Sequence, residues 1–181
     1  MAPSTTTPPI HPETPMGEIL QAYPSARRAL FMRYHVGGCS SCGYDPSDTL
    51  ADVCKSHNIL DVDEVIRHIH ASHEADIRLQ VDVHETQRLM QANEGWRLID
   101  VREDFERDIA ALEGAEAISQ ELVQSLMGGP KDTKIIFFCH HGIRSLDAAS
   151  YFVGHGFEHV RSMSGGIDAW SQQIDSAIAR Y

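Results

Sequence analysis

The chain has 181 residues, of which 42% are hydrophobic and 23% are charged, and its formal net charge at pH 7 is −11. This length suits one domain or two small ones, and the composition is typical of soluble globular proteins. An acidic chain without a Lys and Arg cluster argues against nucleic acid and anionic membrane surfaces as partners. No apolar stretch approaches the length of a membrane span. We therefore expect no nucleic acid and no membrane among its partners.

Residues 1–15, MAPSTTTPPIHPETP, are rich in Pro and Thr. This composition predicts a disordered tail. The stretch has neither the basic region nor the apolar core of a secretory signal. We therefore expect a cytoplasmic protein, in which the four cysteines are reduced thiols, metal ligands or redox groups rather than structural disulfides.

Residues 16–75 are predicted to form a small all-helical domain. Apolar residues recur at helical spacing after Thr14-Pro15, within SARRALFMRYH (25–35), from residue 50 to residue 57, and after Asp61. Glu64 follows Asp61 by three residues, as in a capping box. The glycines and the proline of VGGCSSCGYDP (36–46) interrupt the helical pattern. A unit this small needs stabilisation from a metal, a disulfide or its neighbour.

Cys39-Ser40-Ser41-Cys42 forms a CxxC motif in this Gly-rich turn, and Cys54 follows on an apolar helical face. The motif is consistent with a redox dithiol. It is also consistent with half of a metal site, completed by Cys54 and a histidine such as His35 or His57. An iron–sulfur cluster held by thiolates is a third interpretation. A second CxxC pair is absent, and three unconnected cysteines are the remaining alternative.

Residues 16–70 are similar to a small helical domain with paired cysteines, found alone and at the head of iron–sulfur cluster repair proteins. The matching features are GEILQAYPSA (17–26), GGCSSCG (37–43), TLADVC (49–54) and the closing helix. The resemblance implies thiol redox or cluster-related work without specifying either. His70, His73 and Glu74 share a face of that helix, which we expect to be solvated rather than metal-binding.

From residue 76 to residue 181, apolar strand-like runs alternate with helical patterns. The strands are predicted at 79–83, 98–101, 135–139 and 159–163, and the helices at 85–91, 120–126, 145–153 and 166–174. This alternation predicts an α/β domain with a doubly wound parallel sheet covered on both faces. The protein is therefore expected to combine an N-terminal small all-α domain with an α/β domain.

Cys139 ends the most hydrophobic of these strands, within FFCHHGIRS (137–145). It should lie at the carboxyl edge of the sheet, where doubly wound folds bind their ligands. The turn that follows directs backbone N–H groups toward one centre, beside the positive end of a helix, and so favours an anion such as a thiolate. Arg144 adds a positive charge that could hold an anionic substrate. The alternative is a buried cysteine acting as a small hydrophobe, and the Gly and Arg of the turn disfavour it.

Residues 80–175 resemble a rhodanese homology domain, the sulfurtransferase module. LIDVREDFE (98–106) resembles its first signature, CHHGIRS (139–145) its active-site loop, and GFEHVRSMSGGIDAW (156–170) its closing stretch. The resemblance implies that Cys139 takes the outer sulfur of a donor such as thiosulfate as a persulfide and passes it to a thiol or cyanide. It implies no required cofactor. It also implies that the backbone amides of the loop stabilise the persulfide, namely those of His140, His141, Gly142, Ile143, Arg144 and Ser145.

The chain departs from the family at residues 110–115, where AALEGA replaces the usual Gly-His-Ile-Pro-Gly-Ala. The missing histidine puts the packing of this loop in doubt. The pair corresponding to Asp100 and Arg102 is mostly structural in the family, and we expect the same here. Of the two adjacent histidines, His140 and His141, we expect either tuning of the loop's potential or simple surface exposure.

Two other functions compete with sulfur transfer. A rhodanese fold could serve as a non-catalytic binding module, with the CxxC domain sensing redox state. Phosphatases of the cell-cycle type and related arsenate reductases share the fold but use a Cys-x5-Arg loop. Here Cys139 and Arg144 are spaced as Cys-x4-Arg, and the smaller loop suits a sulfur atom better than a tetrahedral phosphate. A further hypothesis is that Cys39 and Cys42 receive the sulfur, reduce the persulfide or hold a cluster that it feeds.

Overall fold

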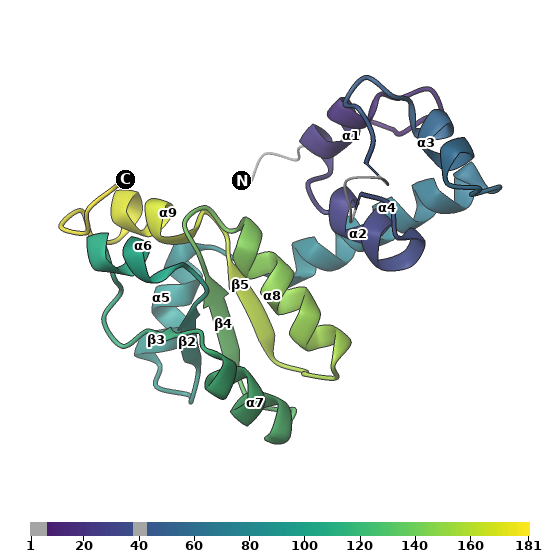
Figure 1. Ribbon diagram of the computed structural model, residues 1–181. Helices are drawn as coiled ribbons and strands as arrows, with labels where there is room; N and C mark the ends of the chain where they lie inside the picture. Colours follow the sequence, from purple (N-terminus) through teal and green to yellow (C-terminus); the bar gives the residue numbers. More distant parts are fainter. Residues whose placement is uncertain (1–6, 38–42) are drawn as a thin grey trace. The chain divides into compact units, whose positions relative to one another are not determined.

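The computed structural model describes residues 7–37 and 43–181. The chain divides into two compact units, residues 1–77 and 78–181 (Figure 1). The first contains one hydrophobic core, and the second contains two, one on each face of its sheet. Across the described ranges, no helix has both the length and the apolar character needed to cross a membrane.

The first unit is helical, as its apolar spacing predicts. Its helices are α1 (Met16–Ala22), α2 (Ala26–Tyr34), α3 (Leu50–Ser56) and α4 (Val62–Leu79). Thr49 caps α3 through a capping box with Asp52. The core joins residues from all of these helices, among them Ile19, Leu30 and Ile69. Burial between the helices therefore stabilises α1, α2 and α3, which with 7, 9 and 7 residues are individually too short to be stable.

Residues 8–15 pack against this unit, in contrast to the disordered tail predicted for residues 1–15. Ile10 is 6% exposed and belongs to the core. The Tyr23 hydroxyl donates to the Pro8 carbonyl at 2.8 Å, and the Leu50 N–H donates to the Thr14 carbonyl at 3.1 Å. One buried apolar side chain and these hydrogen bonds order a segment whose composition alone predicts disorder. Residues 1–6 lie outside the described part of the chain.

The second unit is built on a parallel sheet with strand order β1-β5-β4-β2-β3. The strands are β1 (Gln80–Val81), β2 (Arg97–Asp100), β3 (Glu116–Ala117), β4 (Ile135–Phe138) and β5 (Val160–Met163). Four of them coincide with the predicted apolar runs, with ends that differ by one or two residues. The short edge strand β3 was not predicted, because two residues carry no alternation.

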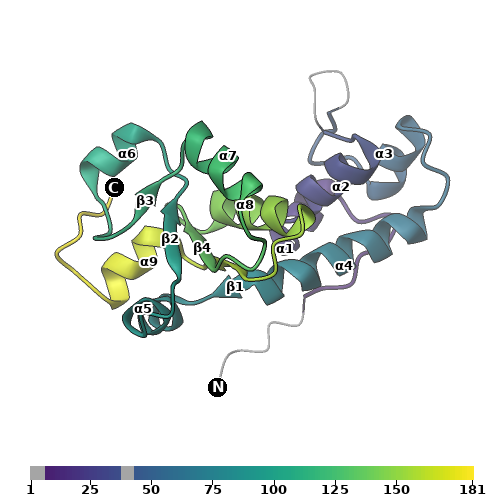
Figure 2. The ribbon, with the colours of Figure 1, turned by 90° about the horizontal axis from the view of Figure 1, so that it is seen from below.

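Helices cover both faces of the sheet (Figure 2). The helices of this unit are α5 (Val83–Gln91), α6 (Asp104–Ile109), α7 (Gln120–Gly128), α8 (Ile143–Gly154) and α9 (Gly166–Gln173). Ile136 and Phe138 of β4 pack in the core that contains α5 and α9 residues. Ile135 and Phe137 point to the opposite face, into the core that contains α7 and α8 residues. The predicted doubly wound α/β fold, preceded by a helical region, is confirmed.

The strand order reverses its direction at the carboxyl ends of β2 and β4. From β2 the chain moves outward to β3, and it then returns to β4 on the other side of β2 before reaching β5. Such a reversal opens the crevice in which doubly wound folds bind ligands. Arg102 follows β2 and Cys139 follows β4, so both predicted motifs meet at this point.

Candidate active site

The thiol of Cys139 lies at the base of the loop between β4 and α8, and the residue is 2% exposed. The Gly142 N–H donates to Sγ over 3.1 Å, and the Ser145 hydroxyl donates to Sγ over 3.6 Å. Ser162 of β5 donates in turn to the Ser145 hydroxyl at 2.9 Å. The sulfur therefore has a backbone donor and a hydroxyl donor, which together stabilise negative charge on it.

The loop has its shape because Gly142 adopts φ +96° and caps α8. L side chains rarely adopt this conformation, whereas glycine does so freely. The N-terminus of α8 is thereby brought next to Sγ, and its partial positive charge adds to the two donors. Of the backbone amides predicted to form the cradle, that of Gly142 donates to the sulfur, and Ser145 contributes its hydroxyl, which was not predicted. His140 and His141 lie in the same loop, and Ile143 and Arg144 lie in the first turn of α8. Their side chains are directed to other partners or to solvent.

The start of α9 forms the wall behind the loop. Gly165 and Gly166 have φ +73° and +57° and form the turn that opens this helix. The Cys139 carbonyl accepts from the Ile167 N–H at 2.9 Å. A Cβ atom on Gly166 would lie 2.3 Å from the carbonyl oxygens of both Cys139 and His140. The closing stretch of the domain therefore packs directly on the backbone of the active-site loop.

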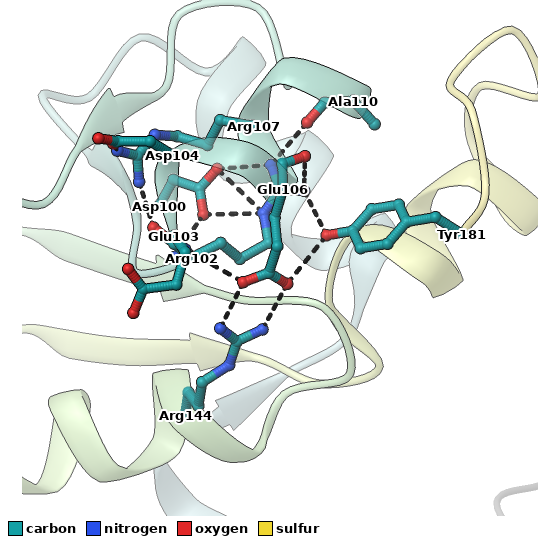
Figure 3. Close-up of polar contacts among 9 residues, drawn as sticks. All are labelled: Asp100, Arg102, Glu103, Asp104, Glu106, Arg107, Ala110, Arg144 and Tyr181. Carbon is teal, nitrogen blue, oxygen red and sulfur yellow. Dashed lines mark hydrogen bonds and ion pairs between the residues drawn. The ribbon is translucent and has the colours of Figure 1, made fainter.

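Arg144 makes a bidentate ion pair with Glu106 of α6, with distances of 2.6 and 2.7 Å (Figure 3). These hydrogen bonds from Arg144 hold the pKa of Glu106 at about 2, although burial of the carboxyl opposes them. Arg144 was predicted to hold an anionic substrate, and its charge is here shared with a carboxylate. Glu106 was not predicted as a site residue. The feature of the sequence that could have identified Glu106 is its position inside the first signature motif, four residues after Arg102.

Asp100 and Arg102 form a buried ion pair, 2% and 1% exposed. The Arg102 guanidinium also donates to the Ala110 carbonyl at 2.8 Å, so it holds the start of the segment that departs from the family pattern. In that segment Ala110 and Leu112 are buried in the core. The loop is thus packed without the missing histidine, and these contacts agree with the structural role expected of the pair.

His140 lies between two aromatic rings. It stacks on His141 with ring centroids 3.9 Å apart and on Tyr181 with centroids 4.2 Å apart. Burial, followed by the nearby His141, lowers the pKa of His140. The Tyr181 hydroxyl contacts both Arg102 and Glu106 (Figure 3). Tyr181 was not predicted, because it belongs to no motif and lies 79 residues from Arg102 along the chain.

The cysteines of the first unit divide into two groups. Cys39 and Cys42 lie outside the described residues. Cys54 is 1% exposed in the helical core, and burial raises the pKa of its thiol. Among the residues described, no three His, Cys, Asp or Glu side chains gather as metal ligands would. His70 and His73, expected on a solvated face, instead pack edge-on against the ring of Tyr23.

Comparison with protein families matches residues 82–173 to the rhodanese-like domain. The chain belongs to the rhodanese-like domain family. The thiosulfate sulfurtransferase GlpE of Vibrio cholerae is 34% identical over 93 residues, which cover 51% of this chain and 87% of that protein. The thiosulfate sulfurtransferase GlpE of Pseudoalteromonas translucida is 36% identical over 84 residues, which cover 46% and 80%.

The solved structures include the reduced CoADR-RHD of Bacillus anthracis, with 26% identity and a TM-score of 0.50. The match covers 66% of this chain and 21% of that one. The match to the rhodanese-like domain spans the three motifs on which the resemblance was based. The predicted resemblance to a rhodanese homology domain is therefore confirmed. Because that match begins at residue 82, the resemblance of residues 16–70 to the paired-cysteine domain stays a prediction.

Proposed function

We propose that the protein is a sulfurtransferase that carries sulfur as a persulfide on Cys139. The observation that supports this best is the pair of donors on the Cys139 sulfur, the Gly142 N–H at 3.1 Å and the Ser145 hydroxyl at 3.6 Å. The similarity to two thiosulfate sulfurtransferases supports thiosulfate sulfurtransferase-like activity, with thiosulfate or a related sulfane-sulfur compound as donor.

The first half of the reaction loads the enzyme. The Cys139 thiol loses its proton, and the thiolate attacks the outer sulfur of thiosulfate. A bond forms between Sγ and that sulfur while the S–S bond of thiosulfate breaks, and its electron pair leaves with sulfite. The product is a persulfide on Cys139, whose outer sulfur carries the negative charge. The Gly142 N–H and the N-terminus of α8 lie where they would stabilise this charge.

The second half discharges the enzyme. A thiolate or cyanide attacks the outer sulfur, the S–S bond of the persulfide breaks, and the electron pair returns to Cys139 as a thiolate. The acceptor leaves as a persulfide or as thiocyanate. Atoms and electrons balance over the two halves without an oxidant, a reductant or a cofactor. Arg144 would assist the first half by attracting the dianionic donor, for which it must turn part of its guanidinium from Glu106.

Mass spectrometry of the intact protein after thiosulfate treatment tests the proposal. Wild type should gain one sulfur atom that cyanide removes as thiocyanate, and Cys139→Ser should gain none. Cys54→Ser is the matched control, because it removes a buried thiol of the first unit, and it should load as wild type does. Failure of a free Cys139 thiol to take up sulfur would contradict the proposal and favour a non-catalytic binding module. Hydrolysis of an aryl phosphate would favour a phosphatase.

For the helical unit we propose that Cys39 and Cys42 act as redox or acceptor thiols for the sulfur of Cys139. Two thiol sites in one chain have a raised effective concentration for each other. The burial of Cys54 disfavours it as a third ligand for a metal or an iron–sulfur cluster, which is the alternative at this motif. Reduced thiols fit a reducing compartment, so we also propose a cytoplasmic location. Sulfur transfer from Cys139 that is unchanged by Cys39→Ser and Cys42→Ser would contradict the acceptor role.

A further inference from the structure

Tyr181 reaches the active site from outside the motifs that define it (Figure 3). Its hydroxyl accepts a hydrogen bond from Arg102 Nη1 at 2.8 Å and donates one to Glu106 Oε1 at 3.1 Å. Its ring stacks on His140, with planes inclined by 26°. One side chain therefore contacts the buried ion pair behind β2, the carboxylate that holds Arg144, and the first residue after Cys139.

The segment that carries Tyr181 is itself tied to α9. Ser171 of α9 donates to the Ile178 carbonyl at 2.7 Å. Arg180 Nε donates to Asp168 Oδ1 at 2.8 Å, and the backbone N–H of Asp168 donates to the His140 carbonyl at 3.2 Å. Arg180 is thus anchored on α9, next to Tyr181 in the chain, so the position of the tyrosine is set by more than its own contacts.

Glu106 divides its negative charge among several donors. Oε1 accepts from Arg144 at 2.7 Å and from Tyr181 at 3.1 Å, and Oε2 accepts from Arg144 at 2.6 Å and from the Glu103 N–H at 3.1 Å. The hydrogen bond from Tyr181 takes up part of the charge that Arg144 and the Glu103 N–H would otherwise neutralise without it. The Arg144 side chain is 44% exposed. Its guanidinium can therefore turn toward an anion in solution once its ion pair with Glu106 is weakened.

We propose that Tyr181 is a positioning residue for sulfur donor binding. Its hydroxyl fixes Glu106 and shares its charge, which keeps Arg144 available to an anionic donor, and its ring holds His140 at the loop. This inference rests on the proposed function and adds a residue outside its motifs.

Tyr181→Phe removes the hydroxyl and keeps the ring stacked on His140. Thiosulfate as donor and dithiothreitol as acceptor give ping-pong kinetics, which separate the two halves of the reaction. Of the two hydrogen bonds of the hydroxyl, the one to Glu106 acts on Arg144, and its loss should lower kcat/KM for thiosulfate roughly 2- to 10-fold through a higher KM. Dithiothreitol is mostly uncharged at neutral pH and attacks as a thiolate with one negative charge, whereas thiosulfate carries two, so its kcat/KM should depend little on Arg144 and stay close to that of wild type. A purely structural role would lower both constants together.

The matched control is Tyr151→Phe. Tyr151 of α8 is 51% exposed, and its ring contacts that of His155 with centroids 4.2 Å apart, much as Tyr181 contacts His140. It has the same chemistry outside the site, and its loss should change neither constant. Tyr181→Leu removes the ring as well, and should raise the pKa of His140 toward its ordinary value because the imidazole becomes exposed. His141, Asp168, Glu106 and Arg102 also act on the pKa of His140, and all four remain in the variant. An NMR titration of the histidine signals measures this without any turnover.

The outcomes separate the two proposals. A wild-type protein that takes up no sulfur overturns the proposed function, and the role of Tyr181 falls with it. An active wild type with an equally active Tyr181→Phe overturns the role of Tyr181 alone, as does an equal fall of both constants. A fall confined to the thiosulfate constant, with Tyr151→Phe unchanged, supports the inference.

Discussion

Replacement of Gly166 by Ala should displace the backbone of the active-site loop. The added Cβ would lie 2.3 Å from the carbonyl oxygens of Cys139 and His140. Both are backbone atoms, so no flexible side chain can move aside. These carbonyls accept hydrogen bonds from the N–H groups of Ile167 and Asp168, at 2.9 and 3.2 Å. The loop and the start of α9 must therefore separate to admit one methyl group.

The cost has two parts. A non-glycine residue in the left-handed region costs about 1–2 kcal/mol, and Gly166 has φ +57°. Weakening of the two hydrogen bonds adds about 0.5–1.5 kcal/mol each. The free energy of unfolding should fall by about 2–5 kcal/mol in all. Gly156→Ala is the control, because Gly156 has φ +87° and a Cβ added there would meet no atom within 4 Å, so it should show only the backbone cost.

Urea unfolding followed by tryptophan fluorescence measures both variants. Trp96 and Trp170 are the two tryptophans of the chain, and both belong to the second unit, so the signal reports that unit. Gly166→Ala should also lose most of its rate of sulfur loading under conditions in which it is still folded, because Cys139 moves with its carbonyl. If Gly166→Ala is no less stable than Gly156→Ala and loads sulfur at the wild-type rate, the close packing of α9 on the loop is refuted.

Three further predictions concern buried polar groups. Asp100→Ala leaves the buried guanidinium of Arg102 without its carboxylate and should lower the free energy of unfolding by about 3–5 kcal/mol. Glu94→Ala, at an exposed ion pair, should cost less than about 1 kcal/mol, and equal losses in urea unfolding would contradict the structural role of the buried pair. The pKa of Glu106 is about 2 against an ordinary 4.5, so its carboxylate stabilises the fold fully above pH 4.5, and this contribution is lost as the pH falls through about 2. The free energy of unfolding of Glu106→Gln should decline less steeply over that interval than that of wild type, and an identical decline would refute the assignment. Ser145→Ala removes the hydroxyl donor to the Cys139 sulfur and should slow sulfur loading roughly 2- to 10-fold; an unchanged rate would show that the backbone donor suffices.

Much of the second unit could be predicted because its signals are local. The strand β4 is a continuous apolar run, β2 and β5 lie within or beside shorter apolar runs, and the alternation with helices indicates a parallel sheet. The helix α6 and the strand β3 were missed because six and two residues are too few to show a period. The packing of residues 8–15 was also missed, since composition reports the average behaviour of a segment and not the one side chain, Ile10, that finds a core.

The place of Cys139 was determined by the sequence itself. A strand followed directly by a cysteine, a turn with Gly142 and then a helix sets the thiol at the helix N-terminus through backbone geometry alone. The surroundings of Arg144 depend on residues far apart along the chain. Glu106 lies 38 residues from Arg144, and Tyr181 lies 75 residues from Glu106. No periodicity or turn rule reports such pairs, because they form only when the sheet brings α6, α8 and the segment after α9 to one edge. The pairing of Arg144 with the Glu106 carboxylate is therefore determined by the tertiary structure and not by any local sequence pattern.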